Sequence, residues 1–407
     1  MRIFCFNRYV YPDHSATSQL LTDLAEHLSG AGYEVVLVGS SQCYDAADAA
    51  LPAHEHVRGF EVMRVGGTRF GRNSLLGRSL DYMSYLLAAA RLLRRHVVEG
   101  DVVVLMTDPP LLGTLLGPLA RRRGARVVNW LQDMFPEIAE VLLGAPMRWA
   151  GPPLRSLRNR GLRMADRNVV ISRAMATRVA AAGVANERIG LIENWTDEQG
   201  VLPVEPRHNP LRREWGMQDK FVIGYSGNLG RAHDWQTMLE VADTLRARED
   251  IHFVLIGGGK GAHAFANAAG LRGLSNISVQ SYQSRENLSN SLSVPDLHWF
   301  SLHPALEGCI LPSKLYGIQA AGRPALFIGA MDGELARFLR DTGTGFAVAP
   351  GSASEVCASI ERLIGDPALA ATMGMRARQY LEANGTRSAA LMRWQAVLAS
   401  TSSQGNH

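Results

Sequence analysis

The sequence has few cysteines and lysines and no long hydrophobic run. Its four cysteines, Cys5, Cys43, Cys309 and Cys357, lie far apart without a Cys-x-x-Cys pair. This spacing argues against a disulfide or structural zinc framework and fits a reducing cytosol. No stretch of 18 apolar residues could span a membrane, and the N-terminus lacks the apolar run of a signal peptide. We therefore expect a cytoplasmic protein, soluble or at most peripheral on the inner face of the cell membrane.

Lysine is rare: of the 42 basic residues only Lys220, Lys260 and Lys314 are lysines. An ammonium and a guanidinium differ chemically, so each lysine is a candidate for a specific role. The net charge of +4 is weak evidence for a nucleic-acid or anionic membrane partner. With 46% apolar and 20% charged residues the composition is that of a globular chain, which excludes a disordered, collagen-like or coiled-coil protein. A length of 407 residues predicts two domains.

Short apolar runs alternate with helical patterns through both halves of the chain. This alternation predicts right-handed βαβ units and parallel sheets. The pattern stops between Glu198 and Gly216, where three prolines mark a linker. We expect two doubly wound, Rossmann-like domains at residues 1–200 and 201–380. Residues 381–407 are expected to form a helix that packs back on the first domain, followed by a disordered tail.

Several well-known motifs are incomplete or missing. Gly257–Ala262 follows a strand and matches G-x-G-x-x-A, but no acidic residue lies between Asn267 and Arg285 to bind a ribose. Because no Ser or Thr follows Lys260, this is not a P-loop; a structural glycine turn and a nucleotide-facing loop both remain open. The sequence has no D-x-D, H-E-x-x-H or G-x-S-x-G. His54-Glu55-His56 has the wrong spacing for two ligands on one helical face, so a solvated loop is expected there.

The stretch Ser301–Pro324 combines a strand end, a glycine-containing loop and a proline suited to the first turn of a helix. We expect a helix to begin near Pro312, which would leave the N–H groups of Cys309 through Leu311 and of Ser313 free to bind an anion. Lys314 could add a charge for a phosphate oxygen, and Glu307 suits sugar hydroxyls. An ordinary βα loop with an exposed Glu and Lys is the alternative interpretation.

A second stretch, Ile223–Trp235, has similar features. Tyr225 ends a predicted strand, three glycines allow the backbone to approach a ligand, and Arg231 and His233 add cationic or donor groups. Two such loops at the carboxyl ends of strands in one parallel sheet would border the same crevice. That both motifs fall at one edge of the sheet is stronger evidence for a ligand-binding site than either motif alone.

Together, in this order, the motifs resemble those of GT-B glycosyltransferases of family 4, in particular bacterial exopolysaccharide and O-antigen transferases of the colanic-acid type. The resemblance covers nearly the whole chain. The segments that carry it are Tyr11–His14 with the following helix, Trp130–Glu137, Glu193–Asp197, Ser226–His233 and Pro312–Tyr316.

This resemblance implies a GT-B fold with a cleft between the domains and retaining transfer of a sugar from a nucleotide diphosphate, with uracil as the favoured base. It implies a glycan or lipid-linked acceptor, no metal and no cofactor besides the donor. Implied catalytic residues are Arg231, Lys314, Gln132 and Asp133. Implied donor-binding residues are Gly227, Asn228, His233, Tyr282, Glu307, Gly308, Cys309, Ile310, Leu311, Ser313 and Glu334. Implied acceptor-binding residues are Tyr11, His14 and Ser15.

One position departs from the family pattern. The family carries two glutamates in the Ser301–Pro324 region; Glu307 matches the first, and Gly317 stands where the second, ribose-binding one is usual. Glu334 or the backbone is expected to take over that contact.

Two segments, Arg72–His96 and Pro146–Arg167, mix arginines with apolar residues. Such segments can bind an anionic membrane surface, although core helices with a solvated arginine face are an equal alternative. Two other functions stay open: a GT-B sugar-nucleotide epimerase, and an arginine-rich nucleic-acid-binding protein. The second is disfavoured because only Pro146–Arg167 is densely basic.

Overall fold

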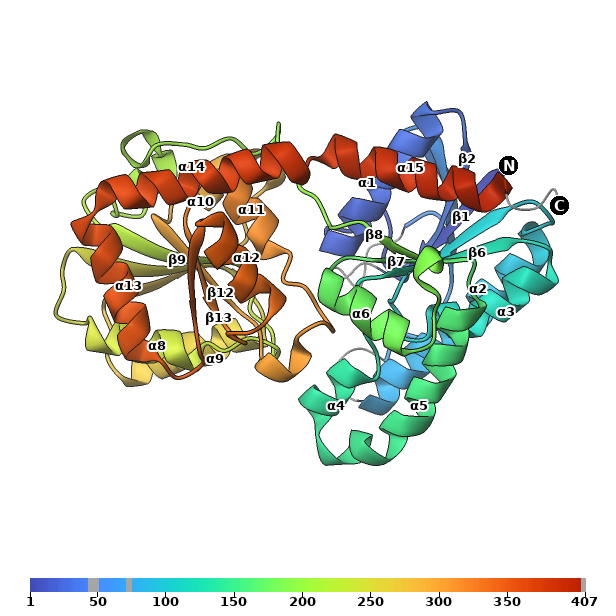
Figure 1. The fold of residues 1–407 in the computed structure, drawn as a ribbon, viewed down its shortest axis with the longest axis horizontal. Helices are drawn as coiled ribbons and strands as arrows, with labels where there is room; N and C mark the ends of the chain where they lie inside the picture. The colour runs from blue at the N-terminus through green and yellow to red at the C-terminus, as the bar shows by residue number, and fades with distance from the viewer. Residues whose placement is uncertain (43–50, 71–74, 404–407) are drawn as a thin grey trace. The chain divides into compact units, whose positions relative to one another are not determined.

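The computed structural model describes residues 1–42, 51–70 and 75–403, so the predictions for Cys43 and for positions 72–74 lie outside the described residues. The chain divides into two compact units (Figure 1). The first contains residues 1–194, 308–311 and 388–407, and the second contains residues 195–307 and 312–387.

The first unit is built on a sheet with the strand order β3-β4-β2-β1-β5-β6-β7-β8. Neighbouring strands are parallel except for the hairpin of β3 and β4 at one edge. The inner strands are continuous apolar runs, as expected for a sheet covered on both faces. The strands are β1 (Arg2–Phe6), β2 (Glu34–Ser40), β3 (His54–Val57), β4 (Phe60–Val65), β5 (Val102–Leu105), β6 (Arg126–Leu131), β7 (Arg167–Val170) and β8 (Ile189–Leu191).

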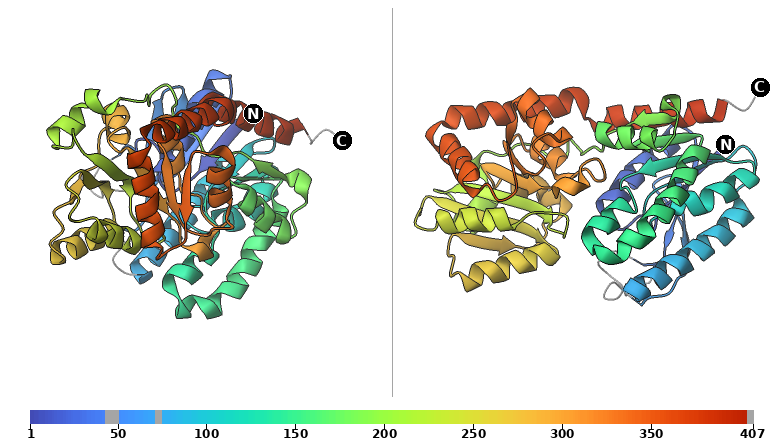
Figure 2. Two further views of the ribbon diagram at one scale, coloured as in Figure 1. Left: turned by 60° about the vertical axis from the view of Figure 1, so that its left-hand side comes forward. Right: turned by 60° about the horizontal axis from the view of Figure 1, so that its bottom comes forward.

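Helices cover the two faces of this sheet. On one face α2, α3 and α5 pack in a row, as Figure 2 shows. On the other, α1 and α15 lie side by side (Figure 1), where His27 Nε2 lies 2.9 Å from Gln395 Oε1. The helices are α1 (Ala16–Gly30), α2 (Leu75–His96), α3 (Leu112–Arg122), α4 (Glu137–Leu143), α5 (Ala145–Met164), α6 (Arg173–Ala181) and α15 (Arg387–Ser403).

The second unit has a parallel sheet with the order β11-β10-β9-β12-β13-β14. Helices α8, α9 and α13 form one layer against it, and α11, α12 and α14 pack together in another (Figure 1). The strands are β9 (Phe221–Asn228), β10 (Ile251–Gly258), β11 (Ile277–Gln280), β12 (Leu297–Ser301), β13 (Ala325–Ile328) and β14 (Gly345–Val348). The helices are α7 (Pro210–Glu214), α8 (Gln236–Thr244), α9 (Lys260–Leu271), α10 (Leu288–Leu292), α11 (Lys314–Ala320), α12 (Glu334–Thr342), α13 (Ala353–Gly365) and α14 (Pro367–Asn384).

The two doubly wound sheets confirm the predicted fold class. The expected solvated loop at His54-Glu55-His56 is wrong, because these residues form the edge strand β3. There the alternate side chains are exposed and His54 lies 2.5 Å from Glu61 on β4. A four-residue hairpin strand in which only Val57 is apolar has no apolar run, which is why the periodicity missed it.

Candidate functional site

In the second sheet the connections from β9 run to one side, toward β10 and β11, and those from β12 run to the other, toward β13 and β14. The adjacent carboxyl ends of β9 and β12 therefore form the topological switch point, where open α/β sheets bind ligands. The two stretches singled out in the sequence continue past these two strands, at residues 229–235 and 302–313, and β9 ends at Asn228 rather than at Tyr225. The expected shared edge is confirmed.

Lys314 lies at this edge, and its ammonium packs on an aromatic ring of the same unit. Its Nζ is 5.0 Å from the ring centroid of Tyr225, a cation–π contact, and its Cε lies close to Gly227. The Tyr225 hydroxyl donates to the carbonyl of Asn228 at 2.9 Å, which fixes the ring. Burial lowers the pKa of Lys314 to about 8. The ammonium is thus preorganised, and still mostly protonated at neutral pH.

His233 is a neutral group in this structure. Its Nδ1 lies 2.5 Å from the carbonyl oxygen of Ser301, which assigns the proton to Nδ1 and leaves Nε2 as an acceptor. Burial, together with the charge of Lys314, lowers the pKa of His233 to about 4. The roles expected for this side chain were a cation or a hydrogen-bond donor to a ligand; the ring is instead neutral, and its free nitrogen is an acceptor. Arg231 is exposed on the same loop, and no carboxylate among the described residues lies within 4 Å of it.

The glycines after β10 support the β9 loop rather than forming a separate dinucleotide site. A Cβ on Gly257, at φ +134°, would lie 2.3 Å from the carbonyl oxygen of Gly227, and one on Gly259, at φ +109°, would lie 2.1 Å from Asn228 Oδ1. The Leu229 N–H also donates to the carbonyl of Gly258 at 2.8 Å. The structural glycine turn is therefore the interpretation that the contacts favour, with the exposed ring of Tyr282 beside it.

Glu307 is tied to helix α12. Its Oε1 accepts the backbone N–H of Glu334, the first residue of α12, at 2.7 Å. A carboxylate at this position offsets the positive end of the helix and satisfies one of its unpaired donors. Glu307 and Glu334, the two predicted donor-binding acids, therefore lie side by side through a backbone contact that sequence spacing did not suggest. Gly317 lies within α11.

The segment before α11 differs from the prediction. Helix α11 begins at Lys314 rather than at Pro312, and Ser313 precedes it. Gly308, Cys309, Ile310 and Leu311 belong to the first unit. There the carbonyl of Cys309 accepts the N–H of Met134 at 2.9 Å, and Ile310 forms an isolated bridge with Asp133. The expected helix start at Pro312 is therefore wrong, and Cys309, Ile310 and Leu311 do not form the first turn of α11.

In the first sheet the switch point lies between β1 and β5. Gln132 and Asp133 follow β6, one strand further along. The amide of Gln132 is buried and makes two reciprocal hydrogen bonds with Asn194, at 2.9 and 2.8 Å. Asp133 is an exposed residue, but protein atoms surround its carboxylate. The resulting loss of solvation, together with the charge of Asp108, raises the pKa of Asp133 to about 6. The side-chain amide of Gln132 is thus fixed by its two hydrogen bonds to Asn194. Asp133 has a carboxylate whose pKa lies close to neutral pH.

The predicted acceptor residues lie in the turn before α1. The N–H of Ser15 donates to Asp13 Oδ1 at 2.8 Å, and His14 is exposed. The ring of Tyr11 meets that of Phe60 edge-on, with the Arg58 guanidinium 5.1 Å from its centroid. Tyr11 is therefore engaged in packing on β4.

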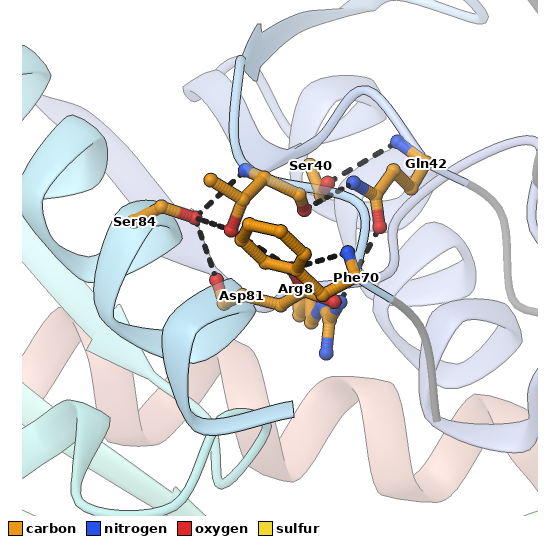
Figure 3. Close-up of polar contacts among 7 residues, drawn as sticks. Arg8, Ser40, Gln42, Phe70, Asp81 and Ser84 are labelled. Carbon is orange, nitrogen blue, oxygen red and sulfur yellow. Dashed lines mark hydrogen bonds and ion pairs between the residues drawn. The ribbon is translucent and has the colours of Figure 1, made fainter. Parts of the chain in front are cut away.

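A buried polar cluster at the same edge was missed by the sequence analysis (Figure 3). The Arg8 side chain, only 7% exposed, lies 3.9 Å from the 3% exposed Asp81 and donates to Gln42 at 3.3 Å. The Arg8 guanidinium also lies over the rings of Tyr9 and Tyr82, at 5.2 and 5.0 Å. Its Nε is buried, and no hydrogen-bond partner for it is found among residues 1–42, 51–70 and 75–403. The available signal was its position directly after the first strand, at the switch point.

Two further properties bear on function. Among residues 1–42, 51–70 and 75–403, no group of three or more His, Cys, Asp or Glu side chains could hold a metal ion. In the same part of the chain, no helix is long and apolar enough to cross a membrane.

Two doubly wound domains are the architecture of the GT-B fold, and comparison with known proteins gives the family. The glycosyl transferase 4-like domain family matches residues 16–195, and the glycosyl transferases group 1 family matches residues 209–380. The chain belongs to the GT-B glycosyltransferases, with a family 4-like first domain and a group 1 second domain. The sequence-based resemblance is confirmed.

Curated relatives include the colanic acid biosynthesis glycosyl transferase WcaI of Escherichia coli, 31% identical over 60% of this chain and 62% of that protein. Glycosyltransferase WbjE of Pseudomonas aeruginosa is 27% identical over 69% of this chain and 70% of that protein. The alignment thus spans less than two thirds of WcaI. The epimerase and nucleic-acid alternatives are not favoured by these relatives.

Solved structures share the fold at low identity. Sucrose-phosphate synthase from Thermosynechococcus elongatus has a TM-score of 0.80 at 15% identity, covering 98% of both chains. Anabaena Alr3699/HepE, solved in complex with UDP, has a TM-score of 0.73 at 14% identity, covering 98% of this chain and all of the other.

Proposed function

We propose that this protein transfers a sugar, with retention of anomeric configuration, from a nucleotide diphosphate sugar to a hydroxyl of a glycan acceptor. The observation that carries the proposal is the Lys314 ammonium, held over Tyr225 at the switch point of the second sheet beside a neutral His233. A fixed cation there can stabilise the negative charge that grows on a departing diphosphate. Arg231, exposed on the β9 loop, supplies a second cation.

In the proposed reaction the bond between the anomeric carbon and the diphosphate oxygen breaks, and the acceptor oxygen bonds to the same face of that carbon. The acceptor proton passes to the leaving phosphate oxygen, so no protein nucleophile is needed. We further propose that the diphosphate needs no divalent cation, because Lys314 and Arg231 supply the charge. Activity should then persist in EDTA; complete loss with rescue by Mg²⁺ or Mn²⁺ would contradict this step.

The base of the donor is proposed to be uracil, a choice supported by the UDP complex of the structurally similar HepE. A screen of nucleotide sugars for binding and slow hydrolysis, with the products identified by NMR, tests both the donor and the stereochemistry. Binding of UDP-sugars by the wild type and its loss in Lys314→Ala are expected. Equal binding by the variant would contradict the assignment of the site.

The acceptor is proposed to bind at the carboxyl edge of the first sheet, near Arg8, Asp81 and Asp133. A guanidinium beside a carboxylate offers donors and acceptors to sugar hydroxyls. Arg8→Gln should raise the KM for acceptor and leave donor binding unchanged. A variant with unchanged acceptor KM would place the acceptor elsewhere.

The protein is also proposed to bind anionic membranes, at the cytoplasmic face, through helix α2. Leu76, Leu80, Met83 and Leu87 lie on one face of α2 at helical spacing, and each side chain is more than half exposed. Arginines on the same helix would meet anionic headgroups. By contrast Arg155 and Arg158 on α5 pair with Glu140 and Glu137 at 3.2 and 2.7 Å.

Co-sedimentation with phosphatidylglycerol vesicles tests the membrane proposal. The triple variant Leu76→Gln, Leu80→Gln, Met83→Gln should lose most of the binding. A matched control replaces three exposed apolar residues elsewhere, Leu271, Met375 and Met392, with Gln. Equal binding by the wild type and the α2 variant would contradict this docking face.

A further inference from the structure

Four arginines surround a pocket in the first unit, at the edge of the sheet opposite the predicted acceptor residues. The pocket has a volume of about 500 Å³. It lies where β6, β7 and β8 begin, whereas Arg8, Gln132 and Asp133 lie where strands end. We name it the arginine pocket, and its lining residues are Arg121, Arg126, Arg163, Met164, Asp166 and Arg188.

The charge in this pocket is unbalanced. Its one carboxylate, Asp166, already accepts the N–H of Val127 at 2.8 Å and pairs with Arg126 and Arg121 at 3.4 and 3.6 Å. Arg163 and Arg188 donate to backbone carbonyls instead, at 3.0 and 3.5 Å. Within the described part of the chain neither has a carboxylate within 4 Å. Four guanidinium groups against one carboxylate leave a formal charge of +3.

Helix dipoles explain only part of this arrangement. Arg121 and Arg163 lie in the last turns of α3 and α5, where a cation is favourable. Arg126 opens strand β6, and Arg188 precedes strand β8, so neither serves an α-helix end. Like charges gathered around one concavity repel one another. A bound anion would relieve that repulsion.

We propose that the arginine pocket binds a phosphate-bearing anion, at a site separate from sugar transfer. Planar guanidinium groups bind phosphate oxygens in pairs, and a pocket of this volume is within the range of small-molecule sites. Two sources share this chemistry: a free diphosphate, or the phosphate headgroup of an anionic lipid. Bound there, the anion would join the ends of α3 and α5 to the start of β8.

Isothermal titration with inorganic pyrophosphate tests the free-ligand source. The protein used is full-length Lys314→Ala, Arg231→Ala, so that the proposed donor site does not contribute. Adding Arg163→Gln and Arg188→Gln should weaken binding at least tenfold, and higher salt should weaken the parent's binding. Gln keeps a donor for the backbone carbonyls, and thermal unfolding checks that the fold is intact.

A control in the same background replaces Arg213 and Arg393, exposed arginines outside the pocket, with Gln. It removes the same charge and should bind pyrophosphate like the parent. The lipid source is tested by co-sedimentation with phosphatidylglycerol vesicles. If only vesicle binding falls in the Arg163→Gln, Arg188→Gln protein, the anion is a lipid headgroup. If both ligands bind the pocket variant and the control equally, the proposal is wrong.

Discussion

Lys314 combines a positive charge with a buried environment, and this sets a pH limit on the proposed reaction. Only the protonated amine can stabilise the leaving diphosphate. Burial lowers its pKa to about 8, so kcat/KM for the donor should fall as pH rises through that value. Lys314→Arg should keep activity to higher pH, because a guanidinium stays protonated. Lys314→Ala should lower turnover by roughly 10²–10³-fold at pH 7.

The same pH profile can also contradict the proposed role of Lys314. A wild-type profile that stays flat well above pH 8, with Lys314→Arg indistinguishable from it, would remove Lys314 from the catalytic step. His233 faces Lys314 but is neutral throughout this range, since its pKa is lowered to about 4. Titration of His233 therefore does not contribute to the pH dependence of kcat/KM near pH 8.

Glu307 is expected to affect both stability and donor selection. Loss of its hydrogen bond to the Glu334 N–H in Glu307→Ala should lower the free energy of unfolding by about 1 kcal/mol. The same variant should weaken discrimination between epimeric donors. Glu334→Ala keeps the backbone N–H and serves as the control in chemical denaturation. Equal stability of Glu307→Ala and wild type would mean that the capping contact is unimportant.

At the scale of elements, the turn after β10 determines the shape of the loop after β9. Gly259→Ala would place a Cβ 2.1 Å from Asn228 Oδ1 at a positive φ, so it should destabilise the protein by more than about 1 kcal/mol and weaken donor binding. Gly270→Ala, in helix α9 with nothing within 4 Å of the added Cβ, is the matched control. Donor affinity and unfolding midpoints measure both effects. Unchanged donor affinity in Gly259→Ala would separate this turn from the site.

At the scale of the whole molecule, the last helix completes the first unit. Trp394 on α15 is fully buried, and its ring lies 4.5 Å from that of Trp130 on β6. Trp394→Ala should therefore lower the stability of the first unit by about 3–5 kcal/mol. Met392→Ala, an exposed position on the same helix, should change it by less than about 0.5 kcal/mol. Hydrogen exchange of β6 amides would localise the loss, and unaltered protection there would contradict this role.

The sequence by itself determined the fold class and the edge at which β9 and β12 carry their loops. It could do so because apolar periodicity and glycine or proline turns act locally along the chain. Tertiary structure alone decided that β3 pairs with β4, that Glu307 caps α12 and that Arg8 meets Asp81. The partners in the last two contacts are separated by 27 and 73 positions in the sequence. Such contacts depend on packing between elements, which no local pattern encodes. The neutral state of His233 and the arginine pocket have the same origin, because burial and charge density belong to the folded chain.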